Sequence, residues 1–411
     1  MFYKALFDAA NREGHSIRLV VPSDSTRLEK VGDFGLVYHL EAPRAPVSPQ
    51  YRMLYPTRFL LPGTEIQRII NDEAPDLVEV SEKYTMNYLA GLLRTRRLPG
   101  VRVRPTVIGV SHERMDENMA AYFTDSPAGK AFCRWYMKWV YFPMFDHHVT
   151  VSEHTAEELI EASHGHKIKR GIWVAPMGVD CDRFTPARRS PNGREELLRL
   201  AGAGSDTTIL LYAGRLAPEK NIPLLIDTAR RLDPALFRLV IAGEGILLDD
   251  LRAECTRAAL HHVVFLGHVQ DRGTLADHYA NADVFIHPNP REPFGIAPLE
   301  AMAAGLALVA PDTGGVISYA DNGNSWLSSA DSEQFAASVR SIQADPITRF
   351  RKTAAARQRA EHFRWENVTS RHLQLYRELD AITRGDEQAL TIAPRAWTTT
   401  GDAFGREIVS G

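Results

Sequence analysis

Two glutamates mark the stretch of this 411-residue chain with the clearest potential for chemistry. Glu292 and Glu300 stand eight residues apart within NPREPFGIAPLEAMAAGLALVAPDTGG, residues 289–315. Proline and glycine between them predict a tight loop that enters a helix ending at Gly305. A helix N-terminus favours phosphate because its N–H groups are unpaired and its dipole end is positive. If a phosphate binds there, Glu292 lies on the outer side of the phosphate and Glu300 lies on the first turn of the helix. This placement of the two glutamates suits a sugar–diphosphate–nucleoside that is held at both ends.

Two cations in GRLAPEK provide the complementary charge. Gly214 ends a predicted strand, and Arg215 and Lys220 flank a five-residue step into the next helix. Arginine offers a planar fork for phosphate oxygens, and lysine offers a mobile point charge. Two surface charges at a loop are common, so this signal is weak by itself. Combined with residues 289–315, it predicts that both cations converge on one diphosphate.

Two further candidate sites follow predicted strands. His112 lies in a polar loop after PTVIGVS, and ligands of open α/β sheets bind beyond the carboxyl ends of strands. A histidine that caps loop backbone is an equally good interpretation. AGEGILL carries G-x-G after a strand, but Leu248 stands where the third glycine of a dinucleotide fingerprint belongs. We therefore expect no NAD site, and a close approach of a nucleotide to the backbone at Gly243 and Gly245.

Strands and helices must position these residues, and they alternate cleanly in the second half of the chain. This alternation predicts βαβ units and a parallel sheet. The first half begins on a helix over residues 1–15, followed by the strand SIRLVVPS. A doubly wound domain normally opens on a strand and a glycine-rich turn. We predict that this first strand is missing and that its loss leaves a gap inside the sheet. We also predict that Met1 is an internal residue of a longer natural chain. The alternative is a natural variant that begins on the helix.

Composition excludes several classes of protein. The chain is 44% hydrophobic and 24% charged, and its net charge of −3 argues against a nucleic-acid binder. Its length predicts two domains. The three cysteines are far apart, which favours reduced thiols and a cytoplasmic location. No apolar run reaches the ~18 residues of a membrane span, and no signal peptide is recognisable.

An aromatic stretch with interleaved cations, residues 128–146, is predicted to form one helix. It fits an anionic membrane surface, for example the inner face of the plasma membrane, in a peripheral contact. Such a stripe more often packs against a domain core, and we favour that interpretation. Asp180 and Asp182 form a D-x-D in a turn-rich linker, where local hydrogen bonding is a better explanation than a metal site.

From about residue 1 to 380 the chain resembles the retaining glycosyltransferases of family 4, also called glycosyl transferases group 1. The resemblance rests on GRLAPEK, IAGEG, FLGHV and ADVFIHPNPREPFGIAPLEAMAAGLALVAPDTGG, in this order and spacing. It implies a GT-B fold, in which two Rossmann-like α/β domains face each other across a cleft. It also implies transfer of a mannose- or glucose-type sugar from a nucleotide diphosphate sugar to a lipid, glycan or small-molecule acceptor, with retained anomeric configuration.

The resemblance assigns roles to individual residues. It implies that Arg215 and Lys220 bind the diphosphate, that Glu292 contacts the donor sugar near the reaction centre, and that Glu300 binds the ribose. It further implies that His112 approaches the sugar. The remaining predicted donor-binding positions present backbone: Gly214, Gly243, Phe294, Gly295 and Ile296. Fixed cations and a helix N-terminus can stabilise the leaving diphosphate, so we expect neither a metal nor another cofactor.

The predicted domains are an acceptor-side domain over 1–177, with the helix 363–384 packing back on it, and a nucleotide-sugar domain over 187–362. Residues 385–411 are predicted to be a mobile tail. Two departures from the family pattern are the missing glycine-rich turn and Ser318, near a position often filled by glutamate. The missing turn motivates an alternative function, a nucleotide-sugar-binding pseudoenzyme. A sugar-nucleotide epimerase is a second alternative, which the motif combination argues against.

Overall fold

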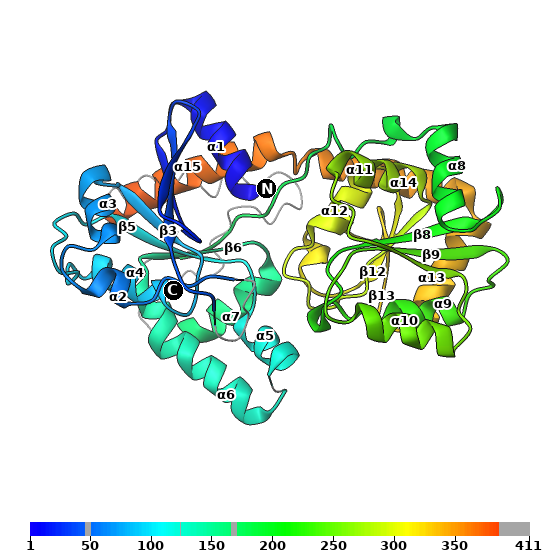
Figure 1. Ribbon diagram of the computed structural model, residues 1–411, viewed down its shortest axis with the longest axis horizontal. Coiled ribbons are helices and arrows are strands. Elements are labelled where there is room, and N and C mark those ends of the chain that lie inside the picture. Colours follow the sequence, from blue (N-terminus) through cyan, green and yellow to red (C-terminus); the bar gives the residue numbers. More distant parts are fainter. Residues whose placement is uncertain (46–50, 124, 166–170, 386–411) are drawn as a thin grey trace. The chain divides into compact units, whose positions relative to one another are not determined.

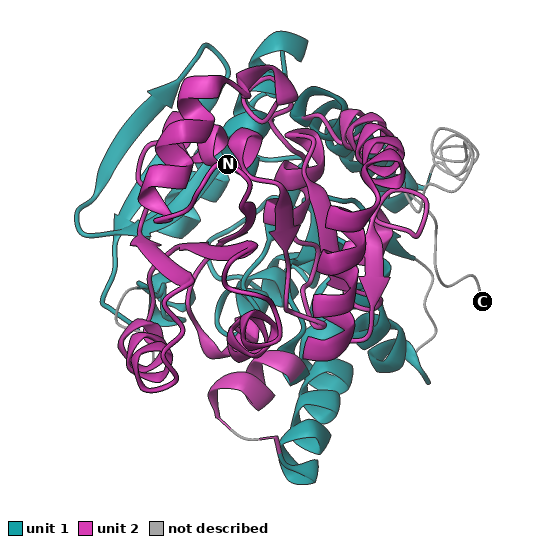
Figure 2. Ribbon diagram, turned by 90° about the vertical axis from the view of Figure 1, so that its right-hand side faces the viewer, with its two compact units in different colours: residues 1–116, 126–176, 365–411 teal, residues 117–125, 177–364 magenta. Residues whose placement is uncertain are grey.

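The computed structural model describes residues 1–45, 51–123, 125–165 and 171–385. Contacts divide the chain into two compact units (Figure 2). Unit 1 comprises residues 1–116, 126–176 and 365–411, and unit 2 comprises 117–125 and 177–364. The predicted limits 177 and 363 lie next to unit limits, whereas residues 117–125, predicted in the acceptor-side domain, and residues 177–186 belong to unit 2. The predicted tail falls, apart from its first residue, on 386–411, outside the described residues.

Unit 1 is an α/β unit whose strands form two separate sheets (Figure 1). Its elements are α1 (Phe2–Glu13), β1 (Ile17–Ser23), β2 (Arg27–Val31), β3 (Gly35–Glu41), α2 (Thr57–Leu60), α3 (Glu65–Glu73), β4 (Leu77–Val80), α4 (Met86–Arg94), β5 (Thr106–Ser111), α5 (Met115–Tyr122, which runs into unit 2), α6 (Pro127–Tyr136), η1 (Met137–Tyr141), η2 (Phe142–Met144), β6 (His147–Thr150), α7 (Glu153–Ser163), β7 (Ile172–Val174) and α15 (Trp365–Arg384).

The predicted gap in the sheet of unit 1 is confirmed. One sheet has the order β1-β3-β2 and the other the order β4-β5-β6-β7, with no pairing between them among the described residues. The residues of β5, β6 and β7 are all buried, whereas nearly all of β1 and most of β4 are only half-buried. Strands β1 and β4 therefore each keep an unpaired edge. The prediction that residues precede Met1 stays a prediction.

Helix α15 completes the core of unit 1. Leu375 and Leu379 pack into the cluster around Val149 and Trp173, and the helix also lies against α1 (Figure 1). Ser370 Oγ donates to Glu13 Oε1 at 2.6 Å, and the rings of Phe2 and His372 are 5.0 Å apart. The last described helix thus joins the first one in a single unit.

Unit 2 is built on one continuous parallel sheet with the order β10-β9-β8-β11-β12-β13. Its elements are η3 (Pro186–Arg188), α8 (Pro191–Leu200), β8 (Thr208–Ala213), η4 (Pro218–Lys220), α9 (Pro223–Arg230), β9 (Phe237–Ala242), α10 (Leu248–Arg257), β10 (Val263–Gly267), α11 (Arg272–Asn281), β11 (Val284–Ile286), α12 (Ile296–Ala303), β12 (Ala307–Pro311), η5 (Gly315–Ser318), β13 (Trp326–Ser328), α13 (Ser332–Ala344) and α14 (Pro346–Glu361).

The stretch 128–146 differs from the prediction in two ways. It is not one α-helix, because α6 ends at Tyr136 and continues as the π-helical turn η1 and the 3-10 turn η2. It also does not bury all its aromatic rings. Tyr136 and Tyr141 are buried, whereas Phe132, Trp135 and Trp139 are 49%, 53% and 59% exposed. The expected packing against the core is therefore correct for one face only.

Candidate functional site

The predicted donor-binding residues lie beyond the carboxyl ends of β8, β9 and β11, and two of them, Ile296 and Glu300, are on helix α12. Strand β8 lies between β9 and β11 in the sheet, which brings together loops that are distant in sequence. A Cβ atom on Gly243 would stand 1.9 Å from the carbonyl oxygen of Gly214, and one on Gly245 would stand 2.3 Å from that of Leu216. Glycine is required here because two backbones touch. The GEG segment therefore serves loop packing, and whether a nucleotide also approaches it stays a prediction.

Glu292 is buried and directly paired with Lys220. The Nζ atom of Lys220 lies 2.8 Å from Oε2 and 3.1 Å from Oε1 of Glu292, and Asn289 Nδ2 donates to Oε2 at 3.2 Å. Burial alone raises the pKa of Glu292, but Lys220 and these hydrogen bonds outweigh it and hold the pKa below its usual value. Glu292 is therefore an ionised carboxylate held in one position.

His287 is a third member of this cluster, which the sequence reasoning missed. Its Nε2 atom lies 3.8 Å from Glu292 Oε2 and has no hydrogen-bond partner among the described residues. Burial lowers the pKa of His287 to about 4, so the imidazole is neutral at pH 7. The signal was present in DVFIHPN, since His287 directly follows β11 just as His112 follows β5. Asn289 was also missed as a partner of Glu292.

Arg215 has a different carboxylate partner among the described contacts. Its side chain is 58% exposed, and its guanidinium binds Glu219 Oε1 at 3.1 Å. The predicted convergence of Arg215 and Lys220 on a diphosphate stays a prediction.

Glu300 lies on α12 and is buried beside an arginine. Arg272 Nη2 donates to Glu300 Oε1 at 2.6 Å. Burial raises the pKa of Glu300 to about 7 although Arg272 lowers it, so desolvation is the stronger effect. Glu300 is the fifth residue of this helix, and therefore lies one turn later than expected. Near pH 7 a small change of environment changes its charge.

The N-terminus of α12 begins at a glycine held in the left-handed region. Gly295 has φ 87°, caps the helix without a side-chain hydrogen bond, and accepts a hydrogen bond from Tyr319 Oη at 2.6 Å. Phe294 is buried with its ring 5.2 Å from that of Tyr319. Ile296 is the first helical residue.

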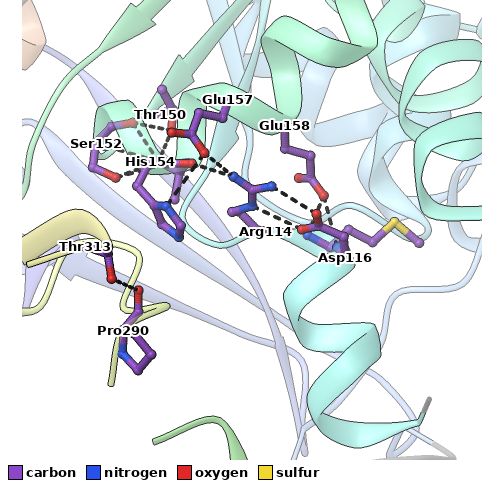
Figure 3. A network of polar contacts seen from close by, with 11 residues as sticks. Arg114, Asp116, Thr150, Ser152, His154, Glu157, Glu158, Pro290 and Thr313 are labelled. Carbon is purple, nitrogen blue, oxygen red and sulfur yellow. Dashed lines mark hydrogen bonds and ion pairs between the residues drawn. The ribbon is translucent and has the colours of Figure 1, made fainter. Parts of the chain in front are cut away.

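The loop before the helix is fastened as well, because Gly315 N donates to the carbonyl of Glu292 at 2.6 Å. Figure 3 shows a further tie, from Thr313 Oγ1 to the Pro290 carbonyl at 3.2 Å.

His112 belongs to unit 1 and follows β5, at a strand end as predicted. Burial lowers the pKa of its imidazole, and the ring lies edge-on to Phe2 with centroids 6.2 Å apart. It is therefore neutral at pH 7. No hydrogen bond of His112 to loop backbone is found among the described contacts, so its approach to a sugar stays a prediction.

A network of charged residues fixes the loop that carries His112 (Figure 3). Glu158 accepts from the backbone N–H groups of Met115 and Asp116 at 2.7 and 3.1 Å. Its other oxygen binds Lys83 Nζ at 2.9 Å, and both side chains are buried. Arg114 links Asp116 and Glu157, at 3.0 and 2.7 Å. The loop is thus tied to helix α7 through both Glu157 and Glu158.

No group of three or more His, Cys, Asp or Glu residues suited to a metal is found within residues 1–45, 51–123, 125–165 and 171–385. The D-x-D aspartates diverge: Asp180 accepts from Arg183 N at 2.9 Å, and Asp182 binds Arg364 at 2.8 Å. The described helices include none that is long and apolar enough to cross a membrane.

Comparisons with known proteins match both units. Residues 194–359 match the family described as Glycosyl transferases group 1, and residues 3–183 match Glycosyltransferase Family 4. A GDP-mannose-dependent alpha-(1-6)-phosphatidylinositol dimannoside mannosyltransferase of Mycobacterium tuberculosis is 30% identical over 390 residues, 91% of each chain. A GDP-mannose-dependent alpha-mannosyltransferase of the same species is 31% identical over 318 residues, 74% of this chain and 72% of that one. Among solved structures, sucrose-phosphate synthase from Thermosynechococcus elongatus has a TM-score of 0.70 at 18% identity and covers 92% of both chains.

Proposed function

We propose that this chain, which belongs to the group 1, family 4 glycosyltransferases and has their GT-B fold, is a retaining transferase of mannose- or glucose-type sugars. Membership makes it a nucleotide-sugar-dependent hexosyltransferase. We further propose GDP-mannose as the donor to test first, because both mannosyltransferase relatives are named for it. The observation that carries the proposal is the ion pair between the half-buried Lys220 and the buried Glu292 beside the N-terminus of α12.

Charge development in the reaction explains this arrangement. When the glycosidic bond to the diphosphate breaks, negative charge grows on the leaving group and positive charge on the sugar. We propose that Lys220, Arg215 and the N–H groups at the start of α12 stabilise the former. The ionised Glu292 stabilises the latter and orients the sugar. The close distance between Lys220 and Glu292 supports a donor that lies with its sugar–phosphate bond beside both.

The other predicted contacts complete the proposed donor site. Glu300 accepts hydrogen bonds from the ribose hydroxyls, and the backbone at Gly295 and Ile296 faces the sugar and phosphates. Gly214 and Gly243 keep the neighbouring loops compact. His112 approaches the sugar as a neutral imidazole. Since fixed cations supply the positive charge, the proposed reaction needs no metal.

For the acceptor we propose a lipid or a glycan. A groove of about 560 Å³ in unit 1 supports a lipid, because it is lined by apolar groups that include Leu60, Tyr88, Leu92 and Met144. A hydrocarbon chain has the chemistry that such walls accommodate. A cytoplasmic location at the inner face of the plasma membrane, with peripheral membrane contact through residues 128–146, belongs to the same proposal.

A donor panel tests the proposed function. The full chain is incubated with GDP-mannose, GDP-glucose, UDP-glucose and ADP-glucose, with and without phosphatidylinositol mannosides, and released nucleoside diphosphate is measured. We expect release with one donor, stimulated by acceptor, and NMR of the product is expected to show the anomeric configuration of the donor. Conversion of the donor sugar without release indicates the epimerase, and binding without release the pseudoenzyme; an inverted product contradicts the retaining mechanism.

A further inference from the structure

Arg272 is the cation that is bound to Glu300 in unit 2. It is the first residue of α11, which follows β10, just as α12 with Glu300 follows β11. Ligands of parallel α/β sheets bind beyond the carboxyl ends of the strands, so both helices begin on the side of the sheet where a donor binds. Arg272 Nη2 donates to Glu300 Oε1 at 2.6 Å. Arg272 therefore lies at the ligand-binding edge of the sheet, in direct contact with a predicted donor-binding residue.

Arg272 is more accessible than the carboxylate that it binds. Its side chain is 32% exposed, whereas that of Glu300 is 5% exposed. The guanidinium also lies over the ring of the buried Phe184, 4.9 Å from the ring centre. The ion pair and this cation–π contact together hold the guanidinium in one place. A ligand that approaches Glu300 from solvent therefore meets a fixed guanidinium first.

Two buried polar atoms beside Glu300 have no hydrogen-bond partner among the described residues. They are Nε of Arg272 and Oη of Tyr279, and the whole Tyr279 side chain is buried. Burial raises the pKa of Glu300 to about 7, whereas Arg272 and the hydroxyl of Tyr279 lower it, so both groups act on this carboxylate. A buried polar group without a partner costs stability. The surroundings of Glu300 therefore keep an unused capacity for hydrogen bonds.

A hydroxyl group matches the pair of Arg272 and Glu300 better than a phosphate does. An ionised carboxylate only accepts hydrogen bonds, and a guanidinium only donates them. A hydroxyl both accepts and donates, because it has lone pairs and one hydrogen. A phosphate oxygen of the donor has no hydrogen to give, and its negative charge is repelled by Glu300. The pair therefore selects a sugar hydroxyl.

We propose that Arg272 is a second ribose-binding residue, which donates to the oxygen of a ribose hydroxyl of the donor while Glu300 accepts the hydrogen of that hydroxyl. This inference deepens the proposed function and rests on it for the assignment of Glu300 to the ribose. It makes Arg272 a determinant of the preference for ribonucleotides over nucleotides that lack the ribose hydroxyls.

Direct binding of nucleoside diphosphates tests this inference without any turnover. Titration calorimetry on the full chain compares GDP, UDP and ADP with their 2′,3′-dideoxy counterparts. We expect the ribonucleotide that binds most tightly to exceed its dideoxy counterpart roughly a hundredfold in affinity, from two hydrogen bonds to charged groups. Arg272→Met has no donor, and we expect this preference to fall to about tenfold. Arg272→Lys keeps the charge without the planar fork and is expected to recover part of the preference.

The matched control is Arg188→Met, which removes another arginine that is tied to the same helix. Arg188 is 34% exposed and binds Asp277 of α11 at 2.8 Å. The control is expected to keep the full preference for the ribonucleotide. A preference in Arg272→Met equal to that of the unaltered protein overturns the inference, even if all affinities fall, because it leaves Arg272 a purely structural role. Tighter binding of the ribonucleotide by Arg272→Met also overturns it, because Arg272 then obstructs the site.

Donor turnover separates this inference from the proposed function. A ribose preference that Arg272→Met weakens, without release of nucleoside diphosphate from any donor sugar, contradicts the proposed function and leaves the role of Arg272 in place. Release from a donor whose nucleoside diphosphate binds no better than its dideoxy counterpart contradicts the role of Arg272 alone. Absence of binding by all the nucleotides contradicts both.

Discussion

Both units fix loops at the ends of parallel strands, but they do so through different interactions. In unit 2 the sheet is continuous and the loops after β8 and β9 touch through glycine backbone. In unit 1 the sheet is divided, and the loop after β5 is held by the buried Lys83–Glu158 pair and by Arg114. Unit 2 should therefore be sensitive to added volume in its loops, and unit 1 to lost charge.

The largest effect is expected from breaking the charge pair of unit 1. Lys83 and Glu158 are 4% and 6% exposed. Glu158→Gln leaves the ammonium of Lys83 without its counter-charge, and we expect the free energy of unfolding to fall by about 3–5 kcal/mol, measured by urea denaturation. The control is Glu196→Gln, which breaks an exposed pair with Arg199 and should leave the midpoint unchanged. Equal midpoints for both variants show that charge does not hold this loop.

The second effect concerns the cation of unit 2. Lys220→Ala removes the partner of Glu292 and the proposed stabilisation of the leaving group. We expect kcat/KM to fall by an amount that corresponds to a loss of about 2–4 kcal/mol of transition-state stabilisation. We expect a loss in the same range for Arg215→Ala. Arg340→Ala, at an exposed ion pair of the same unit, serves as control and should retain the rate. Full activity of Lys220→Ala would falsify its proposed role.

A volume test follows for the glycine contacts. Gly243→Ala places a methyl group against the Gly214 carbonyl, and we expect it to destabilise unit 2 by about 1–3 kcal/mol and to lower activity. Gly204→Ala is the matched control, because nothing lies within 4 Å of its added Cβ. Thermal unfolding of the two variants provides the measurement. A Gly243→Ala variant as stable as Gly204→Ala contradicts the role given to backbone contact.

The smallest effect is a pH dependence of donor binding. The pKa of Glu300 is raised to about 7, so its carboxylate is charged above that pH and protonated below it. Because ribose hydroxyls donate to the charged form best, KM for the donor should rise roughly tenfold from about pH 8 to pH 6. Since the folded pKa lies above the unfolded one, the same group also lowers the stability of the fold as the pH rises toward 7. In Glu300→Gln, KM should no longer depend on pH; a KM of the unaltered protein that is flat over this range contradicts the proposal.

Periodicity and motifs predicted much of this fold. The parallel sheet of unit 2 and the break in the sheet of unit 1 follow from them. The short strands β2 and β13, the short helix α2 and helix α8 were missed because their few apolar residues lie among turn residues. Pro346 separates α13 from α14, and Asp345 caps the second helix by accepting from Thr348 N at 3.0 Å.

The pairing within the candidate site was harder to predict than its membership. Lys220 and Glu292 are 72 residues apart, and they meet because β8 and β11 are neighbours in the sheet. Alternation of strands and helices predicts a parallel sheet but leaves the strand order open. The exposure of Trp135 and Trp139 was likewise unpredicted, because a helix rich in aromatics gives no sign of which face the core covers.

The attachment of α15 to α1 has a consequence for synthesis on the ribosome. Unit 1 contains residues from both ends of the described chain, and the whole of 177–364 is translated between its parts. The cluster around Val149 and Trp173 stays open until Leu375 and Leu379 emerge. Unit 2 can therefore finish folding first. Until unit 1 is complete, its apolar surface stays exposed, which makes the nascent chain prone to aggregate and to bind chaperones.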